Sequence, residues 1–171
     1  YYESTASVKN TSIIGDVSVQ MIDKLADPVQ GITPLKEYKR CPYVQNAGVN
    51  DIYVFIVASI PYRSAILAES DGMNDGDKIN TELFSINATA DWMLLDVQKN
   101  TDTQTMDYIY AYTSGSDVLT KLDAGASTTQ LCSTLKVNHI ANYTDFTGET
   151  FTIDFKAYGI QTAYLGGAQE S

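Results

Sequence analysis

Histidine and cysteine are scarce in this sequence, which contains only His139, Cys41 and Cys132. A multi-histidine zinc site, including the HExxH motif, is therefore excluded by counting. A Ser-His-Asp triad would need His139, but the chain has no G-x-S-x-G nucleophile elbow. A Cys132–His139 pair is the weaker alternative, because a strand cysteine lacks the cationic surroundings that form a thiolate. Phosphate-binding glycine motifs are also missing. We predict that the protein is not an enzyme and needs no cofactor.

Positive charge and long apolar runs are also limited. The chain has 11 Lys and Arg against 21 Asp and Glu, a formal net charge of −10, which repels nucleic acid. Its longest apolar run, Ile52–Ile60, is far shorter than the roughly 20 residues of a membrane-spanning helix. The sequence begins at Tyr1 without a methionine, as after removal of a secretory signal. We therefore expect a protein that is secreted, extracellular or on the cell surface, with no membrane span and no nucleic-acid partner.

The residues that are plentiful favour strands. Of the 171 residues, 44% are hydrophobic and twelve are tyrosine, enough for one domain with a real core. Asp51–Ile60 is apolar on both faces and predicts a central strand covered on both sides, whereas Val17–Ile22 and Phe151–Lys156 alternate like half-buried strands. Further strands are predicted at Lys39–Gln45, Trp92–Lys99, Met106–Ser114 and Thr128–Val137. This pattern predicts an all-β sandwich or jelly roll.

Two places interrupt the strand pattern. Ser64–Glu69 could form one helical turn within an excursion that runs from Arg63 to Glu82. In the last strand the apolar parity changes at Gly159, for which a β-bulge is the simplest explanation.

The sequence offers two kinds of candidate surface site, one for calcium and one for glycans. The loop Glu69–Asp77 offers carboxylates that could bind calcium, but Met73 occupies a position where an EF-hand has a ligand, so a solvated acidic loop is the alternative. Asn10, Asn87 and Asn142 begin Asn-x-Ser/Thr sequences, which accept glycans only in a host that has the machinery.

Cys41 and Cys132 are the two cysteines of a chain that we expect to be secreted. An intrachain disulfide would close a loop of about 90 residues and stabilise the fold by roughly 4–5 kcal/mol in the chain-entropy model. Two free buried thiols and a bridge between subunits are the alternatives.

The N-terminal segment Tyr1–Lys9 has no turn residue and alternates weakly, with Tyr2, Ser4, Ala6 and Val8 on one face. It predicts a strand with small side chains at its centre. Periodicity leaves open whether this strand pairs with its own sheet or with the sheet of a neighbouring molecule.

Three blocks occur in a fixed order along the chain. The first is Tyr1–Thr11 (YYESTASVKNT) followed by Ile14–Val19 (IGDVSV). The second is Lys39–Val54 (KRCPYVQNAGVNDIYV). The third is the tyrosine strand Tyr108–Tyr112 followed by Leu122–Leu131 (LDAGASTTQL). In this order they resemble the secreted biofilm-matrix fibre proteins typified by TasA and camelysin, which have relatives among archaeal bundling pili.

The resemblance implies a jelly-roll-like β-sandwich with short helical excursions that is completed by donor-strand exchange. Residues 1–11 would be the donor strand and residues 12–171 the jelly-roll domain. The implied partners are identical subunits in a linear homopolymer, with neighbouring filaments in bundles. The implied subunit interface consists of Tyr1, Tyr2, Glu3, Ser4, Thr5, Ala6, Ser7, Val8, Lys9 and Asn10.

Two other functions are weighed against the filament subunit. Camelysin-type relatives have been labelled metalloproteases, so a metalloprotease-like enzyme is the second reading, without a zinc motif to support it. A glycan-binding jelly roll that uses surface tyrosines and Trp92 is the third.

Overall fold

The computed structural model describes residues 3–6, 11–14, 17–22, 28–68 and 78–162, the first two ranges as backbone only. These residues form an all-β fold with one short 3-10 turn, which confirms the predicted fold class at that level. The elements are β1 (Glu3–Ala6), β2 (Thr11–Ile14), β3 (Val17–Ile22), β4 (Val29–Gln30), β5 (Glu37–Tyr38), β6 (Tyr43–Asn46), β7 (Ile52–Ala65), β8 (Ile79–Glu82), β9 (Phe84–Ala88), β10 (Trp92–Asn100), β11 (Thr105–Tyr112), β12 (Cys132–Val137), η1 (Tyr143–Phe146), β13 (Thr150–Phe151) and β14 (Asp154–Gln161).

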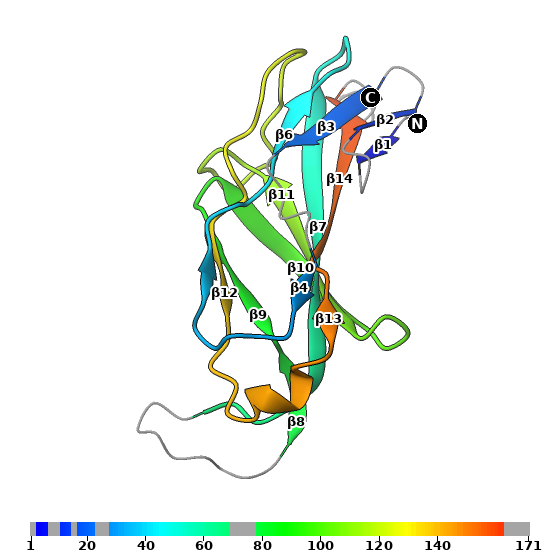
Figure 1. Cartoon of the computed structure of the whole chain (residues 1–171). Helices are drawn as coiled ribbons and strands as arrows, with labels where there is room; N and C mark the ends of the chain where they lie inside the picture. The colour runs from blue at the N-terminus through cyan, green and yellow to red at the C-terminus, as the bar shows by residue number, and fades with distance from the viewer. Residues whose placement is uncertain (1–2, 7–10, 15–16, 23–27, 69–77, 163–171) are drawn as a thin grey trace.

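The strands form one large sheet and three small ones, and all the described pairings are antiparallel. The main sheet has the order β1-β14-β7-β11-β10, with β8 paired to the far part of β7. The small sheets have the orders β2-β3-β6, β5-β12-β9 and β13-β4. Figure 1 shows β7 running along most of the molecule, with β3 and β6 near one end and β12 and β9 in the other half.

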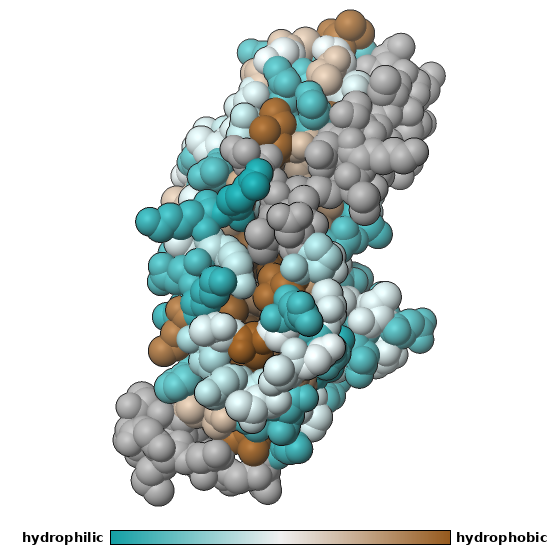
Figure 2. Space-filling view, in the orientation of Figure 1, coloured by the Kyte–Doolittle hydropathy of each residue, from teal (hydrophilic) through white to brown (hydrophobic). Residues whose placement is uncertain are grey.

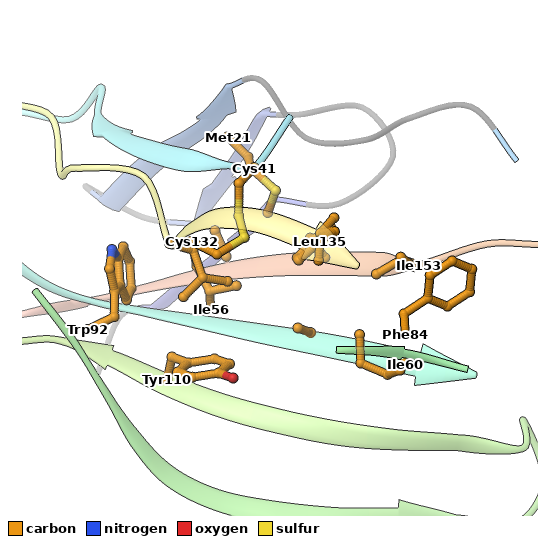
Figure 3. Close-up of a cluster of buried hydrophobic side chains, with 14 of the residues drawn as sticks. Met21, Cys41, Ile56, Ile60, Phe84, Trp92, Tyr110, Cys132, Leu135 and Ile153 are labelled. Carbon is orange, nitrogen blue, oxygen red and sulfur yellow. A yellow bond between two sulfur atoms is a disulfide. The ribbon is translucent and has the colours of Figure 1, made fainter. Parts of the chain in front are cut away.

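The core lies on one face of the main sheet. The even-numbered side chains from Ile52 to Ile60 on β7 are at most 1% exposed. In Figure 3 side chains from β7 face those of β12, and Cys41 joins Cys132 above them. This close burial explains why the alternating strands are recognisable in the sequence.

The other face of β7 is covered less than its sequence predicts. Tyr53, Phe55 and Val57 are half-buried instead of buried. The register places Tyr158 on one side of Phe55 and Ala111 on the other, so these side chains shield one another across the strands. The expectation that Asp51–Ile60 is covered on both sides is therefore wrong for this outer face.

The predicted helical turn at Ser64–Glu69 is also wrong where the structure describes it. Strand β7 continues through Ala65, and Ser64 pairs with Asn80 of β8. The helical excursion is η1, at Tyr143–Phe146. Three predicted strands are shortened, since β6 begins at Tyr43, β12 begins at Cys132 and β11 ends at Tyr112. The strand predicted at Phe151–Lys156 is divided between β13 and β14.

The surface shown in Figure 2 is mostly hydrophilic and is interrupted by separate hydrophobic patches. The most exposed large hydrophobic side chains are Val49, Val118 and Ile79, and exposed apolar residues are common on folded proteins. Within the described part of the chain, no helix combines the length and the apolar character that crossing a membrane requires.

Candidate functional site

Strand β1 is the outermost strand of the main sheet, and β14 is the strand with which it pairs (Figure 1). The rest of the implied interface, Tyr1, Tyr2 and residues 7–10, lies outside the described residues. Opposite β1 the buried row of β14 consists of two small residues, Ala157 and Gly159. The register pairs Glu3 with Ile160, Ser4 with Gly159, Thr5 with Tyr158 and Ala6 with Ala157.

At Gly159 the side chains of β3 pack closely against β14. A Cβ atom at this position would lie 2.8 Å from Cγ1 of Val19, 3.0 Å from Cδ1 of Ile52 and 3.2 Å from Cγ1 of Val17. The pairing of β14 with β7 runs without a register shift through Gly159, so the predicted bulge is wrong. The apparent change of parity arises because Tyr158 and Ile160 are half-buried on the outer face, while the glycine makes room for two valines.

The remaining part of the β14 edge carries charge. Asp154, Phe155 and Lys156 precede the positions that pair with β1, and no described residue pairs with them on that side. Phe155 is fully buried. On the outer face Oδ2 of Asp154 lies 3.8 Å from Nζ of Lys156. Sequence reasoning did not single out this pair, because only the strand register shows that it adjoins the stretch of β14 that pairs with β1.

A second carboxylate lies in the same row of the outer face. The register aligns Asp154 with Ser59 of β7 and Ser59 with Asp107 of β11. These three side chains and Lys156 line a hollow of about 170 Å³. Two carboxylates and one ammonium group therefore surround the hollow, so its side chains carry one net negative charge.

Cys41 and Cys132 form an intrachain disulfide, with their Cα atoms 5.7 Å apart (Figure 3). Both residues are fully buried. The bond joins the segment before β6 to the start of β12 and closes a loop that spans 91 positions. Of the three arrangements left open by the sequence, the structure contains the intrachain bond.

The disulfide excludes the Cys132–His139 pair that the sequence analysis considered. The sulfur of Cys132 is bonded to Cys41, so it cannot form a thiolate beside His139. His139 itself is exposed after the end of β12, and its backbone carbonyl accepts a hydrogen bond from the Ala68 N–H at 2.8 Å. Among the described residues, no group of three or more His, Cys, Asp or Glu side chains is placed to hold a metal ion.

Trp92 is not a surface residue, in contrast to the glycan-binding hypothesis. It is 4% exposed, its indole N–H donates to the Thr129 carbonyl at 3.2 Å, and its ring centroid lies 5.3 Å from that of Tyr112. A sugar ring cannot stack on an indole that is packed in this way.

The three Asn-x-Ser/Thr positions differ in their surroundings. Asn87 is exposed on β9, and its side-chain amide donates to the Ser133 hydroxyl at 2.9 Å. Asn142 is half-buried, since its oxygen accepts the Ile66 N–H at 2.8 Å and its amide donates to Asp145 at 3.0 Å. Asn142 therefore has a local structural role that a glycan would disturb. Asn10 and the whole acidic loop Glu69–Asp77 lie outside the described residues.

Glu82 and two tyrosines line a small cleft of about 130 Å³ between β9 and β11. The Tyr108 hydroxyl donates a hydrogen bond to the Glu82 carboxylate. Burial, followed by this hydrogen bond and the charge of Glu82, raises the pKa of Tyr108. Burial, and then the same charge, raises the pKa of Tyr110 to about 12. Both phenols are therefore protonated donors near neutral pH, which does not suit a general base.

No family model, curated protein or solved structure matches the chain. The feature of the fold that suggests a function is the edge of β14 that β1 occupies.

Proposed function

We propose that the protein is a structural subunit of an extracellular filament and has no catalytic activity. In this filament the N-terminal strand of one subunit would occupy the edge of β14 in the next, at the position that β1 occupies within a single chain. The sandwich would be a jelly roll that is completed by this exchange. The proposal follows what the resemblance to the TasA and camelysin family implies.

The observation that carries the proposal is the location of β1. It is both the first strand of the chain and the outermost strand of the main sheet, next to β14. A strand in this position can leave without separating any other pair of strands, and its departure would expose the unpaired backbone of β14. An identical strand from a neighbour could then restore the same hydrogen bonds.

Exchange of this kind makes a polymer because the two contacting surfaces differ. The donor is at the start of the chain and the acceptor is β14 at its far end, so the contact is heterologous and does not close on itself. Each restored main-chain hydrogen bond contributes about 1 kcal/mol. The same hydrogen bonds are made in the closed monomer and in the filament, so the exchange itself changes the free energy little. Protein concentration and any added contacts therefore decide between the two states.

The register of β1 also supports the expectation that its even-numbered positions face the core. Positions 4 and 6 lie opposite Gly159 and Ala157 of the buried row. Small residues at Ser4 and Ala6 suit this narrow part of the sheet, which β3 covers closely. An extracellular location is supported by the buried disulfide, because such bonds persist in oxidising compartments.

The test is removal of residues 1–10 from the full chain, followed by negative-stain electron microscopy and light scattering. We expect filaments from the full chain and only soluble, less stable protein from the shortened chain. Adding a synthetic peptide of residues 1–10 should raise the unfolding temperature of the shortened chain without restoring filaments. Filaments of ordinary length from the shortened chain would refute the proposal.

A further inference from the structure

Among the described residues, β1 pairs with half of the β14 edge. Strand β14 has eight residues, from Asp154 to Gln161, whereas the ladder with β1 runs from Ile160 to Ala157. After Ala6 the same chain has to reach Thr11, which pairs with β3 in a different sheet. A strand supplied by a neighbour is free of this constraint. The β2 that follows it pairs with β3 of the neighbour and not with β3 of the subunit that receives the strand.

Continuing the register shows what a longer ladder would bring together. In an antiparallel pair each step forward on one strand is a step back on the other. From the pair Ala6–Ala157, the next positions are therefore Ser7 opposite Lys156, Val8 opposite Phe155 and Lys9 opposite Asp154. Val8 would reach the row that contains the buried Phe155, and Lys9 would reach a carboxylate on the outer face.

We propose that, in the filament, the N-terminal segment of a neighbouring copy extends this ladder to Asp154, where its Lys9 pairs with the Asp154 carboxylate. This inference rests on the proposed function and defines its interface. The occupant is the N-terminal segment of a second copy, and the site is the half of the β14 edge formed by Asp154, Phe155 and Lys156.

Charge complementarity supports this occupant. Asp154 has one lysine nearby, Lys156 at 3.8 Å, but shares the hollow with Asp107 as well. One more ammonium group would bring the side-chain charge there to zero. Residues directly opposite each other in an antiparallel pair lie on the same face, with Cβ atoms about 5 Å apart. Lys9 would therefore be held beside Asp154 by the register itself.

The longer ladder also gives a reason for polymer to be favoured over closed monomer. The pairs that involve Ser4 and Ala6 are the same in both states, so they do not discriminate between them. The three additional pairs, from Ser7 to Lys9, would be made only by a strand from a neighbour. Contacts made in one state alone are those that shift an equilibrium.

The experiment exchanges the two charges in the full chain. The concentration above which filaments form is measured by sedimentation for wild type, Lys9→Glu, Asp154→Lys and the double variant. Each single variant places like charges opposite each other and should raise this concentration roughly tenfold. The double variant restores opposite charges in reverse order and should return to within about twofold of wild type.

The matched control is Lys9→Glu combined with Asp96→Lys. Asp96 is exposed on β10, at the opposite edge of the same sheet, so this variant has the same net charge as the first double variant. It should keep the defect of Lys9→Glu. Thermal unfolding of each dissociated protein checks that the fold is intact, and a variant that unfolds early is replaced by Asp154→Asn, which should give a smaller defect.

The outcomes separate this inference from the proposed function. Equal recovery by both double variants, or no recovery by either, would overturn the Lys9–Asp154 pair. If filaments need residues 1–10 but are insensitive to all these substitutions, the pair is wrong and the proposed function stands. A wild-type chain that forms no filaments refutes both.

Discussion

Replacing Gly159 with alanine tests how closely β3 is packed on β14. The new Cβ atom would lie 2.8 Å from Val19, 3.0 Å from Ile52 and 3.2 Å from Val17. The side chains of both valines are branched and stiff at χ1, and both are fully buried, so neither can turn away at low cost. Strand β3 would have to move away from the sheet.

The size of the effect follows from two opposing contributions. Forcing a methyl group into a filled core costs roughly 1–3 kcal/mol. Replacing a glycine lowers the entropy of the unfolded chain, which returns about 0.4–1 kcal/mol. The free energy of unfolding should therefore fall by about 1–2 kcal/mol. For a chain of this size the unfolding temperature should fall by about 3–6 °C.

Urea unfolding followed by tryptophan fluorescence measures the change, since Trp92 is the single tryptophan and is buried. Gly148→Ala is the matched control. A Cβ atom at Gly148 would meet no atom within 4 Å, so that substitution should be neutral or slightly stabilising. If Gly159→Ala is as stable as Gly148→Ala, the close approach of β3 to β14 is wrong.

Two further predictions concern the disulfide and the N-terminal strand. Replacing Cys41 and Cys132 together with alanine should lower the free energy of unfolding by about 4–5 kcal/mol in the chain-entropy model, and a loss below about 1 kcal/mol, or two alkylated thiols in the non-reduced wild type, would contradict the intrachain bond. Ala6→Trp should block filament formation because position 6 lies opposite the buried Ala157, whereas Ser7→Trp should be tolerated better; an equal effect of both on sedimented filament would reject this orientation of the strand.

Alternating strands were the part of the fold that could be predicted from the sequence. Val17–Ile22 coincides with β3 because its alternation reports burial directly. Strand β7 was predicted to end at Ile60, the last residue of the apolar run before Pro61. It continues because the pairing with β14 ends at Ser59, so Pro61 has a strand partner only in β11.

Pairings between strands that are distant in the sequence could not be predicted from it. The helical turn expected at Ser64 is a strand because β8 pairs with it from sixteen positions away, and that pairing leaves no local signal. The candidate site shows the same limit. A strand was predicted at Tyr1–Lys9, of which the structure describes β1 at Glu3–Ala6. Asp154 and Asp107 could be related to it only once the register had aligned three strands in one row.

The disulfide also determines how a subunit would respond to mechanical tension. Strands β1 and β14 lie outside the covalent loop between Cys41 and Cys132. A force applied through these strands passes across the disulfide, so the residues between the two cysteines are not stretched. Roughly half of the residues are then unable to extend, and an unfolded subunit would lengthen by about half of its fully stretched length of ~3.5 Å per residue. In a single-molecule stretching measurement, a reducing agent should release the missing length. The bond would therefore act as a limit on extension that leaves the strands at the joint free to exchange.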